Sequence, residues 1–310
     1  MERHLALLKR LSVDSGMKEF IRNEIRKKEA GIRGEERLLR KLKELRLPGP
    51  FRIFSDVGLH IDDWRVQIDC LIVTDSCCIV LESKNMSGNL NFDIDTEEFY
   101  RIEEENIEKS FPNPYYQLMR NIRFMKEFLN RSFPELKVTG AIVMTSKSCR
   151  IRNKPSHYPI FKLESIIEKI IHLNNNSPSL LLDFDSIEKL IQKKQSAFVY
   201  SPLCEHYHIS PNDIIPGVEC PSCGVIGMER ISTTWTCLAC NKNNRYAHIS
   251  AVEEYFWLIK KEITNKDFRK FCGVKSIHSA SRMLNSMNLQ AFGSGPARYF
   301  IRKDSSLAIS

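Results

Sequence analysis

Long apolar runs are missing from this 310-residue sequence, which has none of the roughly 18 residues that a membrane-spanning helix needs. The first residues hold no apolar core followed by a small-residue cleavage site, so we expect no secretory signal and a cytoplasmic location. Internal repeats and low-complexity tracts are also absent. A hydrophobic fraction of 42% is ordinary for a globular chain, and the length predicts about two domains.

The ten cysteines do not have the spacing of a disulfide framework. Cys70, Cys77, Cys78 and Cys149 lie in apolar runs and are expected to be buried thiols. Four other cysteines form two tight pairs. This usage favours a reducing compartment.

Acidic charge is scarce at both ends of the sequence. Residues 1–50 carry 14 Lys and Arg against 8 Asp and Glu, and residues 220–302 carry 12 against 5. Residues 51–219 reverse this balance, with 19 against 24. Basic ends can grip a phosphate backbone, and an acidic centre can hold a divalent cation. Such charge runs are also typical of solvated helix faces, which is the alternative for each run taken singly.

Residues 1–47 have the periodicity of helices, and Gly31 and Gly34 are expected to break this helical run. Its two apolar faces indicate a homo-oligomer. Asn113 is expected to cap a helix that begins at Pro114. A later helix over 185–195 is expected to have Asp185 as its cap.

Two β-like runs, 66–74 and 77–83, are separated only by Asp75 and Ser76. If these two residues form the tip of a hairpin, facing positions sum to 151, so that Leu71 faces Val80 and Asp69 faces Glu82. The turn residues are not a strong hairpin signature such as Asn-Gly, so the sequence leaves the register open.

Lys84 lies two residues beyond Glu82 and therefore points to the same face of the strand. Opposed carboxylates repel one another, and a divalent cation such as Mg²⁺ or Mn²⁺ would turn that repulsion into attraction. Such a cation can activate a phosphodiester for hydrolysis, with Lys84 stabilising the developing charge. The alternative is a surface charge pair of Glu82 and Lys84 at a strand end.

Four blocks of the sequence follow one another in the order 34-GEERLLRKL-42, 67-QIDCLIV-73, 81-LESKNMSGNL-90 and 113-NPYYQLMRNIRFMKEFL-129. In this order they resemble the nuclease-related domain family, NERD. That family is similar to the PD-(D/E)XK restriction endonucleases. The resemblance implies an α/β fold in which a restriction-endonuclease-like mixed sheet core is flanked by helices. It further implies a metal-dependent nuclease acting on DNA, in bacterial DNA processing or in defence against foreign, including viral, DNA.

The resemblance also implies the catalytic set. Asp69 and Glu82 match the family's metal ligands, and Lys84 completes its (D/E)-x-K pair. Glu35 matches a carboxylate on the first helix, and Gln117 matches a glutamine on the helix after the sheet. Taken alone, Glu35 fits an ordinary acid in a first helical turn and Gln117 an exposed glutamine.

Two C-x-x-C pairs, Cys220 with Cys223 and Cys237 with Cys240, predict a structural Zn²⁺ site. Each pair can hold one ion from a tight turn, and together they complete a tetrahedral set of four thiolates. The stretch resembles a zinc ribbon. A redox dithiol is the competing interpretation, but no βαβ pattern accompanies either pair. His248 is expected to pack or to lie on the surface.

Three short helical patterns and a closing β-like hairpin follow the cysteines and loosely resemble a winged helix-turn-helix, with 276–287 as the recognition helix. The expected nucleic-acid contacts are Lys275, His278, Ser279, Arg282, Arg298 and Arg302. A small helical cap on the zinc ribbon is the alternative.

The expected organisation has five parts. They are an N-terminal helical extension (1–30), the nuclease-like domain (31–197), a linker (198–219), the zinc ribbon (220–248) and a winged-helix-like region (249–310). We expect a nucleic-acid partner, with DNA favoured, no membrane, and either a homo-oligomer or a partner protein. The alternative function is a catalytically silent binding or protein-interaction module that keeps the nuclease fold.

Overall fold

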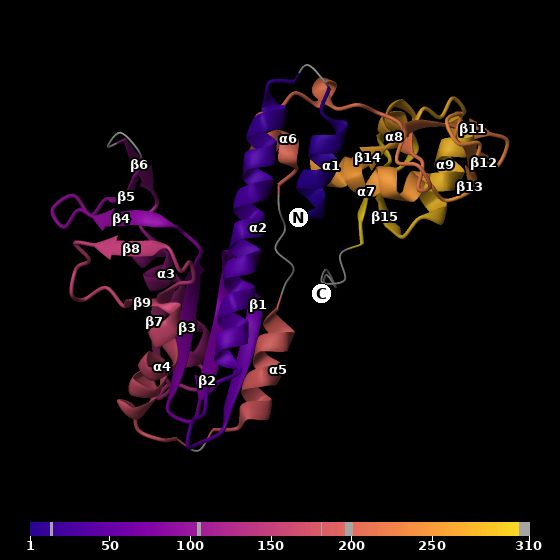
Figure 1. Cartoon of the computed structure of the whole chain (residues 1–310). Helices are drawn as coiled ribbons and strands as arrows, with labels where there is room; N and C mark the ends of the chain where they lie inside the picture. Colours follow the sequence, from indigo (N-terminus) through magenta and orange to yellow (C-terminus); the bar gives the residue numbers. More distant parts are fainter. Residues whose placement is uncertain (13–14, 104–106, 181, 196–200, 304–310) are drawn as a thin grey trace. The chain divides into compact units, whose positions relative to one another are not determined.

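The computed structural model describes residues 1–12, 15–103, 107–180, 182–195 and 201–303 (Figure 1). They divide into two compact units, one of Met1–Lys28 with Val199–Ser310 and one of Glu29–Phe198. The expected boundary at 197 and 198 and the tail from 304 lie outside the described residues. No described helix is both long and apolar enough to cross a membrane.

A mixed five-stranded sheet forms the centre of the unit Glu29–Phe198 (Figure 1). Its strands, in spatial order, are β1 (Phe51–Ile61), β2 (Trp64–Thr74), β3 (Cys77–Lys84), β7 (Lys137–Met144) and β9 (Ile160–Lys162). The first three are antiparallel neighbours, whereas β3, β7 and β9 run parallel. The α/β fold with a mixed sheet is therefore confirmed.

Helices cover both faces of this sheet because its strands are apolar on both sides. Leu71 and Val80 share a core with α3 (Pro114–Asn130) and α5 (Phe184–Lys194). The intervening residues Ile72 and Ile79 share a second core with the end of α2 (Met17–Leu42) and with α4 (Ile166–Asn175). Alternation along each strand thus sends neighbouring residues to opposite helical layers.

Helix α2 runs without a break through Gly31 and Gly34, so the prediction that these glycines interrupt it is wrong. Glycine costs a helix only about 1 kcal/mol relative to alanine, and packing of an apolar face readily outweighs that cost. Gly34 is also needed for the close packing of α2. A Cβ at this position would lie 2.8 Å from Asn85 Cβ and from Thr145 Oγ1, so only glycine lets the helix approach so closely.

The caps of α3 and α5 show which local signals were sufficient. Asn113 caps α3 as predicted, and its side chain accepts a hydrogen bond from the Tyr115 amide. Helix α5, in contrast, is capped by Asp183, whose carboxylate accepts from the amides of Asp185 and Ser186. The prediction of Asp185 as cap is wrong because that residue already lies inside the first turn.

A second sheet in the same unit has the order β6-β5-β4-β8. Its strands are β4 (Gly88–Phe92), β5 (Phe99–Ile102), β6 (Glu108–Phe111) and β8 (Cys149–Arg152). Short 3-10 helices lie elsewhere along the chain, at Leu163–Ser165, Pro211–Asp213 and Gly295–Ala297.

The other unit combines a cysteine-bearing sheet with helices and a second small sheet. The cysteine-bearing sheet consists of β10 (Val218–Glu219), β11 (Ile226–Ile231), β12 (Thr234–Thr236) and β13 (Asn243–Asn244). The remaining elements are α1 (Glu2–Arg10), α6 (Leu203–His206), α7 (His248–Leu258), β14 (Glu262–Thr264), α8 (Asn265–Cys272), α9 (Ile277–Ser286), β15 (Leu289–Phe292) and β16 (Tyr299–Arg302).

The segment expected to be a linker contributes to a core instead. Leu203 and Ile214 are buried and share a hydrophobic core with Leu7 of α1 and Phe268 of α8. The first helix of the chain therefore packs with residues some 200 positions later, because it supplies apolar surface that those elements leave uncovered.

The helices and closing hairpin expected near the C-terminus are present as α7, α8, α9, β15 and β16. Strand β14 was not expected, and it pairs with β16 in a sheet of order β14-β16-β15. Thr264 and Asp267 form a reciprocal capping box at the start of α8. The likeness of this region to a winged helix stays a prediction.

Candidate active site and metal centre

The hairpin of β2 and β3 has the predicted register, with Leu71 opposite Val80 and Val73 opposite Cys78. Pairing ends at Cys70 and Leu81, so the predicted pair of Asp69 with Glu82 is not part of the ladder. Beyond that point the Asp69 carboxylate replaces a backbone partner and accepts the Ser83 amide at 2.8 Å. The end of the ladder therefore places Asp69 against the last residues of β3.

Lys84 joins the sheet to helix α3 at this position. Its ammonium donates to Glu82 Oε1 at 2.8 Å and to Gln117 Oε1 at 2.9 Å. Because Glu82 and Lys84 are two residues apart in a strand, both face the side that α3 covers. The structure thus brings Glu82, Lys84 and Gln117 together from β3 and α3.

Burial makes the charged forms of the carboxyl groups in this cluster unfavourable. Only 1% of Glu82 is exposed. Burial, and then repulsion by Asp69, raise the pKa of Glu82 to about 7 against the opposing effect of Lys84. Burial also raises the pKa of Asp69, although the Ser83 amide and Lys84 counteract it. One ammonium is insufficient to compensate these carboxylates, so the site attracts further positive charge.

Glu35 reaches the same electrostatic environment from α2. Burial, followed by the charge of Asp69, raises the pKa of Glu35. The close approach at Gly34 positions this part of α2, and Asn85 secures it by donating to the Ala30 carbonyl at 2.6 Å. Glu35 also raises the pKa of Glu82, so the three acids interact although they come from three elements.

Asp56 is an acid of this site that the sequence reasoning missed. The β1–β2 pairing passes from Ser55–Cys70 to Val57–Ile68 without a pair between Asp56 and Asp69. Asp56 has a φ of 51°, a conformation that aspartate tolerates better than most residues. Its charge raises the pKa of both Asp69 and Glu35. A two-residue turn between β1 and β2 would have placed it opposite Asp69.

These residues fit a divalent cation. Glu82 Oε2 is buried and has no hydrogen-bond partner among the described residues. The carboxylates do not form a closed cage, because in the described part of the chain the four cysteines are the one group of three or more such side chains that could together hold an ion. An open acidic set suits Mg²⁺, which commonly keeps waters and binds through one or two carboxylates together with substrate phosphate.

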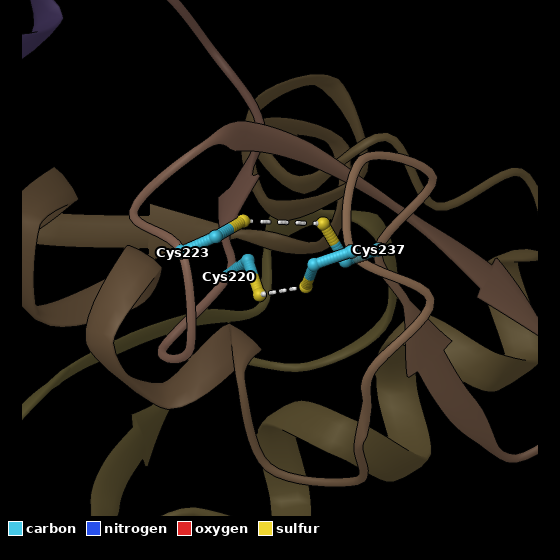
Figure 2. Close-up of side chains that lie close together, drawn as sticks. Cys220, Cys223 and Cys237 are labelled. Carbon is cyan, nitrogen blue, oxygen red and sulfur yellow. Dashed lines mark hydrogen bonds between the residues drawn. The ribbon is translucent and has the colours of Figure 1, made fainter.

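The four cysteines form a much tighter centre. Figure 2 shows Cys220, Cys223 and Cys237 with their thiols close together, and the sulfur of Cys240 completes the group. The sulfurs of Cys220 and Cys240 lie 3.6 Å apart, as do those of Cys223 and Cys237. This separation is too long for a disulfide and close to the roughly 3.8 Å edge of a tetrahedron with metal–sulfur bonds of about 2.3 Å. The cluster can therefore hold a tetrahedral metal ion.

Hydrogen bonds divide the four thiols unequally. Burial opposes the thiolate of Cys220, but the amides of Ser222 and Cys223 and the neighbouring thiols of Cys240 and Cys223 lower the pKa of Cys220 to about 6. A backbone amide also favours the thiolate of Cys240, but burial and hydrogen bonds to neighbouring thiols raise the pKa of Cys240. His248 stands outside the ligand set, since its Nδ1 accepts the Trp235 indole N–H at 3.2 Å and its ring is buried. Its predicted packing role is confirmed.

The five basic residues expected to contact nucleic acid differ in whether their side chains already have partners. Lys275, His278 and Arg282 lie on or beside α9, where they line its outward side. Arg298 donates to Asn285 at 3.0 Å, and Arg302 forms an ion pair with Glu253 at 3.1 Å. Arg298 and Arg302 of the C-terminal hairpin therefore already have side-chain partners.

Residues 30–145 of the chain match the nuclease-related domain family, NERD. This part of the chain is therefore a nuclease-related domain. The matched stretch contains Glu35, Asp69, Glu82, Lys84 and Gln117, and it ends before the cysteine cluster. No curated protein and no solved structure matches the chain.

Proposed function

We propose that the nuclease-related domain is a metal-dependent nuclease that hydrolyses phosphodiester bonds, with DNA as its favoured substrate. The observation that supports this most is the buried, unpartnered Oε2 of Glu82 beside Asp69 and Lys84 in the described part of the chain. Most buried carboxylate oxygens in structural charge pairs have a partner, and a bound cation would supply one for Glu82 Oε2.

Asp69 and Glu82 would hold a Mg²⁺ or Mn²⁺ ion, and Glu35 would support it from α2. When bound, this ion would polarise the scissile phosphate and neutralise charge in the transition state. Asp69 is already oriented for this task by the Ser83 amide, which occupies Oδ2. Fixed carboxylates lower the reorganisation needed when substrate arrives.

Lys84 would act on the attacking water or on the phosphate. An ammonium has three donor hydrogens, and Glu82 and Gln117 account for two. The third remains for a water or for a non-bridging oxygen on which charge develops. Gln117 would set the direction of the Lys84 side chain, since its oxygen accepts from the same nitrogen.

The cysteine cluster would hold a structural Zn²⁺ ion. Four protein ligands leave no open coordination position, so this ion would stabilise the fold and take no part in hydrolysis. The α8–α9 region would contact nucleic acid in the manner of a winged helix, through Lys275, His278 and Arg282. We further propose that the chain acts with a second copy of itself or with a partner protein. Its role would lie in bacterial DNA processing or in defence against foreign DNA.

A nuclease assay on the purified full chain tests the proposal. With Mg²⁺ or Mn²⁺ the wild type should degrade DNA, and Glu82→Gln and Lys84→Ala should each lower the rate by about 100-fold or more. Lys193→Ala, at an exposed lysine of α5, is the matched control and should cut at the wild-type rate. If the wild type cuts neither DNA nor RNA with either ion, the catalytically silent binding module replaces this proposal.

A further inference from the structure

Two adjoining hollows lie in the unit that contains the cysteine cluster. They share Arg230, Ser232 and Ser279, so one continues into the other. The first has a volume of about 560 Å³, within the range of sites that hold small ligands. Arg230 and Arg245 line it from the cysteine-bearing sheet and the segment that follows, and Arg282 lines it from α9.

The first hollow concentrates uncompensated positive charge. No Asp or Glu lines it among the described residues, and none of its three arginines forms an ion pair within that part of the chain. The buried Nη1 of Arg230 has no hydrogen-bond partner there. Burial first, and the charge of Arg245 second, lower the pKa of Arg230. Like charges gathered in a hollow are typical of a site that receives an anion.

Aromatic rings flank these cations. Arg230 lies over the Trp235 ring at 5.5 Å from its centroid, which holds the guanidinium against the sheet. Tyr246 also lines the hollow and is 63% exposed, with the Arg245 guanidinium 6.0 Å from its centroid. An exposed ring beside cations is the arrangement on which unpaired nucleic-acid bases stack.

The second hollow extends the basic surface past Arg230. Lys270 and Lys275 line it, against a single acid among the described residues, Glu229. Its volume is also about 560 Å³. Two basic hollows in succession match the repeated phosphates of a strand better than they match one isolated anion.

We propose that the hollow lined by Arg230, Arg245 and Arg282 binds one nucleotide of a single-stranded nucleic acid. The phosphate lies against the three guanidinium groups and the base stacks on Tyr246. The strand then continues toward Lys270 and Lys275. This inference rests on the proposed function for its substrate, and it narrows that substrate to an unpaired strand. Lys275 and Arg282 would then bind this strand in place of the duplex that a winged helix contacts.

Fluorescence anisotropy with the zinc-loaded full chain tests it, using a labelled single strand of about 12 nucleotides, a length within the site sizes of such proteins, and the corresponding duplex. No Mg²⁺ or Mn²⁺ is added, so binding is measured without cleavage. Arg245→Gln and Arg282→Gln should each weaken strand binding about tenfold, the equivalent of about 1.4 kcal/mol. Each should also reduce the slope of log affinity against log salt by about 0.7.

Two further variants separate stacking from charge. Tyr246→Ala should weaken strand binding about fivefold or more while leaving the salt slope unchanged, because a ring contributes stacking and no charge. Lys266→Gln removes one charge from a position on α8 that lines neither hollow, and it should bind within about twofold of wild type. Circular dichroism and zinc content verify that each variant is folded.

Three results would overturn the inference. The first is that the duplex binds as tightly as the strand. The second is that the arginine variants weaken binding no more than Lys266→Gln does. The third is that a poly-glutamate peptide displaces the strand at equal charge concentration. A chain that binds the strand through these residues but never cuts it contradicts only the proposed nuclease. A chain that cuts, but binds independently of these arginines, contradicts only this inference.

Discussion

The two candidate metal sites of this chain are built in opposite ways. The sulfur atoms of the four cysteines lie within 4.8 Å of one another and form a complete ligand set by themselves. Glu35, Asp69 and Glu82 come from a helix and two strands, interact through their charges and remain open. One site lies in the nuclease-related domain and the other outside it.

This difference separates a site for stability from a site for chemistry. A closed tetrahedral set uses the metal to hold two turns together, whereas an open set leaves room for substrate and water. The cost of openness is visible in the raised pKa of Glu82, because a buried carboxylate without enough partners is destabilising. Four predictions test the contrast, from the largest expected effect to the smallest.

Removing one thiol should disable the closed site. Cys223→Ser should abolish most of roughly 10 kcal/mol of metal-binding free energy and unfold the cysteine-bearing sheet. Cys223 is exposed, so lost core packing cannot explain the effect. Zinc content and thermal unfolding measure it, with the buried Cys149→Ser in the other unit as control. One equivalent of zinc and an unchanged transition in Cys223→Ser would contradict a site made of four cysteines.

Neutralising one carboxylate should relax the open site. The folded-state pKa of Glu82 is about 7, above its ordinary value, so its cost to stability is absent at low pH and complete above pH 7. Glu82→Gln should therefore raise the free energy of unfolding of the nuclease-related domain by about 2 kcal/mol at pH 8 without metal.

Added Mg²⁺ tests the same variant further. It should raise the melting temperature of the wild type but not that of Glu82→Gln, since binding to the folded state stabilises it. Calorimetry at pH 8 with and without Mg²⁺ makes both comparisons. A variant less stable than wild type in metal-free buffer would show that Glu82 is a satisfied structural residue.

The two units should respond to pH with opposite signs. Burial, and then the charge of Arg230, lower the pKa of His248 to about 4. Its contribution to stability is therefore present above the unfolded pKa of about 6.5 and is lost as pH falls toward 4. Between about pH 7.5 and 5.5 the free energy of unfolding of the wild type should fall by about 1 kcal/mol more than that of His248→Gln, whose side chain does not titrate.

Chemical denaturation at both pH values measures this difference, followed through the fluorescence of Trp235 in a chain that also carries Trp64→Phe and Trp257→Phe. Protonation of the Nδ1 that accepts the indole N–H breaks that hydrogen bond, so the fluorescence reports the event directly. Weakened metal binding at low pH affects both proteins alike and cancels. An identical difference at both pH values would mean that His248 is not buried in its neutral form.

The smallest effect concerns how α2 carries Glu35 to the open site. Gly34→Ala should destabilise by roughly 1 kcal/mol, because overpacking against Asn85 and Thr145 exceeds the gain in helix propensity. Gly31→Ala is the matched control, since apart from its own stretch of helix no atom of the described residues lies within 4 Å of its added Cβ, and it should stabilise the fold by up to about 1 kcal/mol. Equal shifts in melting temperature would show that α2 does not pack closely at Gly34.

Local patterns were sufficient wherever a few neighbouring residues decide the structure. The two-residue separation of β2 and β3 predicted the register of the hairpin, because strand pairing across so short a turn has little freedom. The C-x-x-C spacing predicted the cysteine cluster for a similar reason. Asn113 capped its helix as expected.

Local patterns failed where a distant partner decides. Glycine disfavours a helix by itself, yet α2 continues through Gly34 because the residues that follow the central strands β3 and β7 pack against it. Asp185 satisfied the local rule for a cap, but Asp183 precedes the true first turn. Asp56 is an isolated acid in the sequence, and without a predicted β1–β2 turn nothing in its neighbourhood indicated that it would lie near Asp69.

The sequence by itself determined the chemistry that each part of this protein can carry: carboxylates and a lysine on one hairpin, four thiols in two tight turns, and basic charge near both ends. Only the tertiary structure decided which groups meet. Glu35 acts on Glu82 from α2, Gln117 on α3 accepts a hydrogen bond from Lys84, and Arg230, Arg245 and Arg282 share one hollow. Contacts between elements far apart in the chain depend on packing and burial, and no local spacing encodes them.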